Sequence, residues 1–148
     1  METDFLAKLV DLRHDVLVQL RQLARQQAVV IHEADMTRLL SLLGIKQRLL
    51  NELQTFERQL EPFRSQDPDQ RIWRTPADRQ RCREVAERSE SLLGEIVLVE
   101  RECETNLIQR RDHAAVLLQG AHSAARATQG YAVPLESRGS QLDVSCET

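Results

Sequence analysis

The chain has 148 residues, a charged fraction of 29%, a hydrophobic fraction of 41% and a formal net charge of −3. The negative balance argues against a general nucleic-acid-binding protein, because such proteins gain their affinity by neutralising phosphates. Aromatic residues make up only 3% of the chain, and there are 5 glycines and 4 prolines. A chain so poor in turn and strand formers, and rich in Leu, Arg, Gln, Glu and Ala, predicts an all-α fold.

The sequence also bears on location. It has no run of 18 apolar residues, so we expect no transmembrane helix and no membrane insertion. The opening METDFLAKL is acidic and lacks the apolar core of a signal peptide, so we expect a cytoplasmic protein. The three cysteines, Cys82, Cys103 and Cys146, are odd in number and widely spaced. They predict neither a disulfide framework nor a zinc site.

Residues 4 to about 31 have the spacing of an amphipathic helix. Asp35 is a suitable N-cap for a second helix, and the alternative is one helix that continues to Leu60 with a change of phase near residues 33–36. Because no proline interrupts this region and its first glycine is Gly44, beyond the junction, we expect a kinked or nearly continuous helix. The apolar face of the first segment consists of Leu6, Leu9, Val10, Val16, Leu17, Leu20, Leu23, Ala24 and Ile31.

The second segment, residues 36–61, contains the stretch LLSLLGIKQRLLNEL, whose apolar face is wide enough to contact more than one helix. Lys46 lies near the centre of this face, as Arg13 does in the first segment and Glu100 does in the third. Such charges can reach solvent at the edge of a thin bundle, fix the register of the helices, or leave a groove for a partner helix. A Lys46–Glu100 pair requires a register offset, because a simple hairpin places Lys46 nearer Leu92. The face comprises Leu39, Leu42, Leu43, Ile45, Leu49, Leu50 and Leu53.

Residues 61–80 hold three of the four prolines and are expected to connect two helices. Asp67 and Pro68 predict a short helical turn, with Asp67 as its cap. We expect Phe63, Ile72 and Trp73 to fold back and close the end of the bundle. The nearby basic cluster is interpreted as a solvated helix start, with the docking of an acidic partner as the alternative. That cluster comprises Arg71, Arg74, Arg79, Arg81 and Arg83.

Thr75 and Pro76 predict the start of a long helix that continues to about Gln129. Since this segment matches residues 4–61 in length, we expect the two halves to pack as a long antiparallel helical hairpin or up-down bundle. Residues 1–130 then form one helical domain, and residues 131–148, which carry Gly, Pro and Ser without a periodic pattern, form a flexible tail. The apolar stripe comprises Cys82, Val85, Ala86, Ser89, Leu93, Ile96, Val97, Cys103, Leu107, Ala114, Leu117, Leu118, Ala121 and Ala125.

The sequence gives no sign of catalytic chemistry. Asp11-x-x-His14 is the closest approach to a carboxylate–histidine metal motif, and it has no second copy. There is no glycine-rich phosphate loop. We therefore expect no enzyme activity, no cofactor and no metal site.

Two stretches of the chain resemble the FlgN-like flagellar export chaperones. The first is an acidic step followed by a leucine pattern with a central lysine, formed by Glu33, Asp35, Leu39, Leu42, Lys46, Leu49, Leu50 and Leu53. The second, SLLGEIVLVERECETNLIQRRDHAAVLL, is similar to the long C-terminal helix of that family. The resemblance covers roughly residues 9–130, and the connection at residues 67–76 is longer than the family pattern.

The resemblance implies a chaperone that binds hook-associated proteins, which form the hook–filament junction, and delivers them to the type III export gate. It also implies that Tyr131 docks at the gate component. The alternative is a homodimeric coiled-coil scaffold or adaptor without an export role, and the choice between monomer and homodimer stays open. By position, the resemblance assigns substrate binding to Leu107, Ile108, Ala114, Leu117, Leu118 and Ala121.

Overall fold

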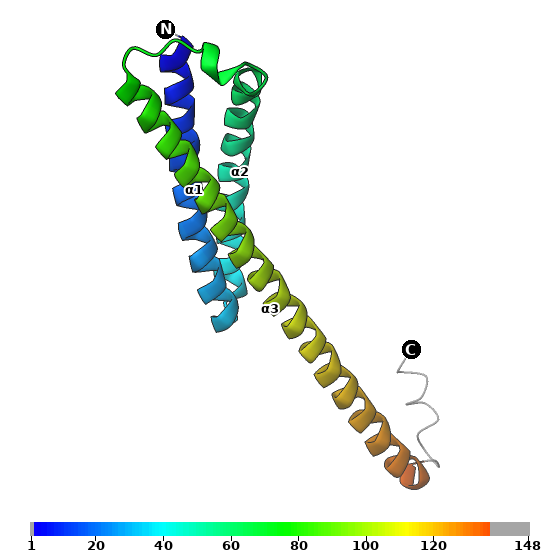
Figure 1. The fold of residues 1–148 in the computed structure, drawn as a ribbon. Coiled ribbons are helices and arrows are strands. Elements are labelled where there is room, and N and C mark those ends of the chain that lie inside the picture. Colours follow the sequence, from blue (N-terminus) through cyan, green and yellow to red (C-terminus); the bar gives the residue numbers. More distant parts are fainter. Residues whose placement is uncertain (1, 137–148) are drawn as a thin grey trace. The chain divides into compact units, whose positions relative to one another are not determined.

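The computed structural model describes residues 2–136, and side chains as far as residue 129. These residues form α1 (Glu2–Glu33), α2 (Met36–Arg64), a short 3-10 helix η1 (Pro68–Gln70) and α3 (Pro76–Glu136), with no strand among them (Figure 1). The predicted all-α fold is therefore confirmed. The chain divides into two units, residues 1–106 and residues 107–148, and α3 contributes to both.

The junction between α1 and α2 is a tight turn and not a kink. The Asp35 N–H donates to the Val30 carbonyl at 3.2 Å and the Ala34 N–H donates to the Ile31 carbonyl at 3.1 Å, which is the Schellman pattern of a helix end. Ala34 has φ 59°, a left-handed conformation that usually belongs to glycine. Asp35 then caps α2 by accepting from the Arg38 N–H at 3.1 Å. The expected cap is confirmed, and the expected continuous or kinked helix is wrong.

In the view of Figure 1, the chain of the first unit runs down, up and down again. α1 and α2 are antiparallel neighbours, and the first part of α3 packs beside them. Residues 4–61 are thus a helical pair in themselves, and not the single leg of a two-stranded hairpin. The arrangement is an up-down bundle, the other form that the sequence allowed.

α1 carries the widest buried face of the bundle. One line of buried residues alternates in steps of three and four from Thr3 to Ile31, and a second line recurs every seven residues at Leu9, Val16, Leu23 and Val30. A helix that packs against one neighbour needs only the first line of buried residues. The second line widens the buried face of α1, so that this helix can pack against two neighbouring helices. All the residues predicted for the apolar face of α1 are buried.

α2 and α3 bury narrower faces than the sequence suggested. In α2, Leu43, Ile45 and Leu50 flank the buried line and are 39–41% exposed. The wide leucine-rich face of this helix is therefore only partly covered in the described structure. The buried positions are Leu39, Leu42, Leu49, Leu60 and Phe63 in α2, and Val85, Ser89, Leu92, Ile96 and Cys103 in α3.

The connection between α2 and α3 closes one end of the bundle. Asp67 caps η1 by accepting from the Asp69 N–H at 3.0 Å, as predicted. Phe63 is buried and Trp73 packs against the same cluster, also as predicted. Ile72 is 73% exposed, so its predicted role in the plug is wrong. Its backbone holds the connection instead, because the Thr3 hydroxyl donates to the Ile72 carbonyl at 2.8 Å.

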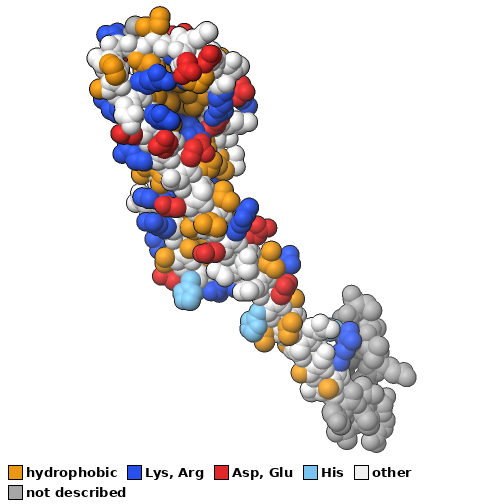
Figure 2. All heavy atoms as spheres, viewed as in Figure 1, with side chains coloured by type: hydrophobic (Ala, Val, Ile, Leu, Met, Phe, Trp, Pro, Cys, Tyr) orange, Lys and Arg blue, Asp and Glu red, His pale blue; other side chains and the backbone are white. Residues whose placement is uncertain are grey.

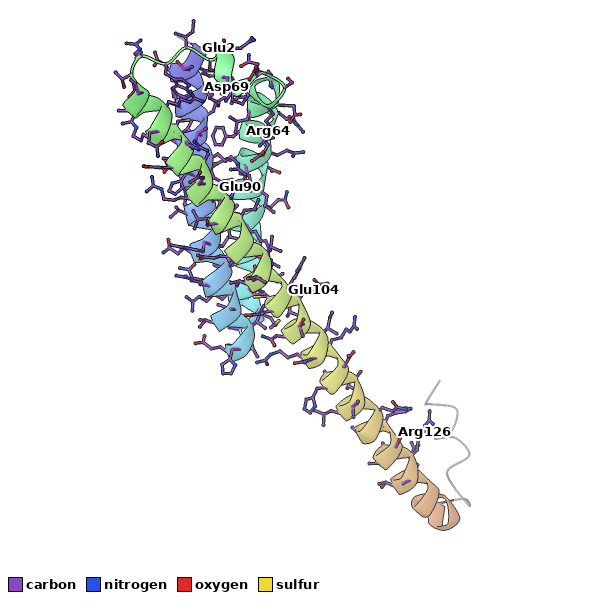
Figure 3. The ribbon with its side chains drawn as sticks, in the orientation of Figure 1. Glu2, Arg64, Asp69, Glu90, Glu104 and Arg126 are labelled. Atoms are coloured by element: carbon purple, nitrogen blue, oxygen red, sulfur yellow. The ribbon has the colours of Figure 1, made fainter. Side chains whose placement is uncertain are left out.

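The charges within the apolar faces form ion pairs between helices. Lys46 Nζ lies 2.6 Å from Glu100 Oε2, which is the pair that required a register offset. Arg13, only 8% exposed, pairs with Glu57 of α2 and with Glu90 of α3, the latter at 3.1 Å. Figure 3 labels Glu90 on α3. Each pair joins two helices at a fixed axial position. Of the three interpretations of these charges, the structure favours control of helix register.

Candidate helix-binding surface

The helix of the second unit exposes its apolar side chains. Of the side chains of residues 107–129, only Leu107 is half-buried and all the others are exposed. Ile108 is 41% exposed, Leu117 60%, Val116 67% and Leu118 72%. Figure 2 shows hydrophobic side chains on this part of the chain, interspersed with basic ones and a histidine. An exposed group of large apolar side chains on a regular helix is typical of a protein–protein contact surface.

The apolar repeat of α3 continues past the end of the first unit. Leu92, Ile96 and Cys103 are buried in the bundle, and Leu107, Ala114 and Ala121 follow them along the helix. At about 100° per residue, all of these positions lie within about 40° of Cys103 around the helix axis. The apolar repeat is therefore the same in both units, but its side chains are fully buried only in the first.

The structure brings most of the predicted substrate-binding residues onto one face. At about 100° per residue, four of them share a helix face and Leu117 lies at its edge. Ile108 lies roughly a quarter turn away, so it does not join this face. Ala125 extends it and is exposed, although it was not among the predicted binding residues. The four that share the face are Leu107, Ala114, Leu118 and Ala121.

We call Leu107, Ala114, Leu117, Leu118 and Ala121 the exposed stripe. Its alanines are two turns apart, and such small side chains let a second helix backbone approach closely. Its leucines supply the energy, since full burial of a leucine side chain contributes about 1.5–3 kcal/mol. The stripe can therefore accept a helix, and each leucine covered by a partner strengthens that contact.

The stripe lies in a positively charged segment of an acidic chain. Residues 107–129 contain three arginines and one aspartate, a net charge of +2, whereas the whole chain has −3. The aspartate, Asp112, is already 3.3 Å from Arg111. Charge at the rim of a contact surface steers partners of the opposite sign. A partner with acidic residues beside its apolar face is favoured here.

The predicted gate-docking residue, Tyr131, lies in the backbone of α3, which continues to Glu136 past the expected end near Gln129. Its side chain lies outside those that the structure describes. Residues 137–148, the larger part of the expected tail, also lie outside the described residues. The assignments of Tyr131 and of the tail stay predictions.

The described residues offer little for other kinds of chemistry. No group of three or more His, Cys, Asp or Glu side chains among them is placed to hold a metal ion. Burial raises the pKa of both Cys82 and Cys103, which favours the unreactive thiol at neutral pH. No helix in the described part of the chain is long and apolar enough to cross a membrane.

Comparison of the chain with known protein families, with curated proteins and with solved structures finds no match. The functional argument therefore depends on the stripe and its surroundings.

Proposed function

We propose that this protein is a helix-binding chaperone, in which residues 107–129 of α3 hold an amphipathic helix of a partner protein. The observation that carries the proposal is the exposure of Leu117 and Leu118, at 60% and 72%, on a helix whose apolar repeat is buried in the first unit and exposed in the second. An amphipathic helix seated there would cover apolar surface on both molecules. The partner is kept from self-assembly for as long as its own apolar face is covered.

The charge of the segment narrows the class of partner. The +2 balance of residues 107–129, three arginines against one aspartate, favours a helix whose apolar face is bordered by Asp and Glu. The alanines at positions 114 and 121 favour close approach, so the partner needs its larger side chains opposite them.

The sharper form of the proposal takes the partner to be a hook-associated protein of the bacterial flagellum. It is supported by the resemblance of residues 33–53 and of α3 to FlgN-like chaperones. In this form the protein acts in the cytoplasm, before type III export, and Tyr131 contacts a component of the export gate. The substrate helix and the gate are then held by neighbouring segments of one chain.

Co-expression tests the proposal. We expect a 1:1 complex with a hook-associated protein of the same genome, measured by size-exclusion chromatography with light scattering. Leu118→Glu should abolish the complex while the helical circular dichroism is unchanged. Leu40→Glu is the matched control, because Leu40 is 69% exposed but belongs to α2. Loss of the complex in both variants, or in neither, would refute the assignment of the stripe.

The alternative function is a homodimeric scaffold in which the stripe pairs with a second copy of itself. The alanine spacing that admits a partner helix also admits an identical helix in antiparallel orientation. Sedimentation equilibrium of the purified protein separates the two functions. A monomer that forms a heterodimer supports the chaperone, and a tight homodimer lost on Leu118→Glu supports the scaffold.

A truncation after Gly130 tests the proposed division of labour. It removes Tyr131 and the residues beyond it, and leaves the stripe. We expect substrate binding to persist and export of the substrate in a motility-competent strain to fall. Equal loss of binding and export would contradict separate sites for substrate and gate.

A further inference from the structure

A cavity of about 500 Å³ lies in the first unit, where η1 and the connection after it pass over α1 and α3. Its apolar walls come from Leu6 and Val10 of α1, Trp73 of the connection and Cys82 of α3. A volume of this size lies within the range of small-molecule sites, which are mostly apolar with a few placed polar groups. Figure 2 shows hydrophobic surface framed by charged side chains at this end of the molecule.

Three guanidinium groups and one carboxylate line the same cavity. Two of the arginines already have partners: Arg79 is 3.3 Å from Asp69 and Arg83 is 3.5 Å from Glu87. Arg71 is different, since no carboxylate among the described residues lies within ion-pair distance of it. The cavity wall therefore contains one positive charge without a counterion in the described part of the chain.

Arg71 is also incompletely hydrogen-bonded. Its Nη2 donates to the carbonyl of Phe63, but its Nε is buried and has no hydrogen-bond partner. A buried guanidinium donor without an acceptor is unfavourable, and a carboxylate is the acceptor that matches its geometry best. A small movement of the side chain toward a bound anion would give Arg71 both a counterion and an acceptor for its Nε.

A neighbouring cavity of about 470 Å³ shares Arg71 but has a different charge. Two carboxylates, Glu2 and Asp67, line it, and Arg71 is its only basic residue. Figure 3 labels Glu2 and Asp69 at this same end of the bundle. Glu2 and Asp67 together repel an anion more strongly than Asp69 does. Asp69 is the only carboxylate that lines the cavity beneath η1, and it is already paired with Arg79. The cavity beneath η1 is therefore the better anion site.

We propose that the cavity beneath η1 binds a small amphipathic monocarboxylic acid, with its aliphatic body on Leu6, Val10 and Trp73 and its carboxylate at Arg71. One uncompensated guanidinium matches one negative charge, which favours a carboxylate over a multiply charged phosphate. The apolar walls require an aliphatic or aromatic body and exclude a purely polar anion such as acetate. This ligand site is separate from the exposed stripe and does not depend on the proposed chaperone function.

Trp73 provides the test, because it is the only tryptophan of the chain and lines the cavity. Decanoate, kept below its micelle concentration, is titrated into the full-length protein while tryptophan emission is recorded. We expect a saturable change with decanoate, a much weaker one with decan-1-ol and none with acetate at the same concentrations. The absence of a saturable decanoate signal, or equal binding of decanoate and decan-1-ol, would overturn the proposal.

Variants locate the carboxylate. Arg71→Met, which keeps an apolar stem, should weaken decanoate binding by about tenfold or more, the ratio expected for loss of a charge-assisted contact. Arg88→Met is the matched control, since Arg88 is exposed on α3 and does not line the cavity. Leu118→Glu should leave decanoate binding unchanged, which separates this site from the exposed stripe. Equal weakening by Arg71→Met and Arg88→Met would contradict the assignment.

A chemical measurement covers the case in which Arg71→Met fails to fold. In a Cys146→Ser protein, Cys82 in the cavity wall and the buried Cys103 are the remaining thiols. Decanoate should slow maleimide labelling of Cys82, identified by peptide mass spectrometry, and decan-1-ol should slow it less. An unchanged labelling rate at saturating decanoate would place the ligand elsewhere and refute the site.

Discussion

The two parts of α3 contain apolar residues at similar helical spacing but bury them very differently. In the first unit Ile96 and Cys103 are 9% and 1% exposed, whereas in the second unit Leu117 and Leu118 are 60% and 72% exposed. The difference does not lie in the helix register, because at about 100° per residue Ala114 and Ala121 lie within about 20° of Cys103 around the helix axis. Apolar content alone does not decide whether a helix face is buried, because the face must also meet a neighbour.

The polar residues differ between the regions in the same way. In the bundle, Arg13 and Lys46 interrupt the buried faces and each has a carboxylate partner on another helix. Around the stripe, the basic residues outnumber the single acid. Balanced charges within a face are expected where the partners belong to the same chain, and an excess of one sign is expected where a partner protein supplies the other.

The largest contrast is expected from leucine truncation. Leu17→Ala, at a side chain with 0% exposure, should lower the free energy of unfolding by about 2–5 kcal/mol through lost burial and a cavity. Leu118→Ala, the control, should change it by less than about 0.5 kcal/mol. Urea unfolding followed by circular dichroism measures both. Similar losses would show that the stripe is buried in the isolated protein.

The buried ion pair should matter more than an exposed one. Glu57→Gln leaves Arg13, 8% exposed, with a weaker acceptor, and should cost about 1–3 kcal/mol of unfolding free energy. Glu87→Gln, the control, removes an exposed pair with Arg83 and should cost at most about 0.5 kcal/mol. Denaturant unfolding at pH 7 compares them, and equal costs would contradict a structural role for Arg13.

The same carboxylate predicts a pH dependence. Burial alone would raise the pKa of Glu57, but hydrogen bonds and charge from Arg64 and Arg13 outweigh burial and hold the pKa below its ordinary value. A lowered pKa stabilises the fold above the unfolded-state value, and this contribution is lost as pH falls below about 4. Thermal unfolding from pH 7 to pH 3 should show a smaller loss of Tm for Glu57→Gln than for the wild type. Parallel curves would contradict the prediction.

The turn between α1 and α2 predicts a stabilising substitution. Ala34→Gly relieves a left-handed residue and should raise the free energy of unfolding by about 1 kcal/mol. Ala28→Gly, the control in the interior of α1, should lower it by about 1 kcal/mol. Opposite signs in denaturant unfolding support the turn described here. Destabilisation by both substitutions would indicate a continuous helix at residues 33–36.

This turn also shows where sequence reasoning fails. The capping role of Asp35 and the buried face of α1 follow from spacing and residue type, and both were predicted correctly. The reversal of the chain was missed because its signal, a glycine after the helix, is absent and Ala34 takes the left-handed conformation. The packing of α1 against α2 outweighs a local cost of about 1–2 kcal/mol, and no single-residue preference reveals that balance.

The candidate stripe was predicted in part for similar reasons. Leu107, Ala114, Leu118 and Ala121 follow one periodicity, so their common face could be identified from spacing. The exposure of these residues could not be predicted from spacing, because it depends on where along α3 the packing of the first unit ends. The apolar repeat itself does not mark this point, because it continues on the same helix face from Cys103 to Ala121. The cavity at Arg71 could not be predicted from the sequence, because the path of residues 65–75 depends on contacts with α1.

Hydrogen exchange tests the central claim, which is that residues 107–129 bind a partner protein and do not pack in the bundle. In dilute, monomeric protein we predict slow amide exchange in α1 and fast exchange in residues 107–129, because a helix without packed neighbours is only marginally stable. On addition of a binding partner, the amides of residues 107–129 should become protected while those of α1 change little. Strong protection of residues 107–129 in the free monomer, or none in the complex, would contradict the account.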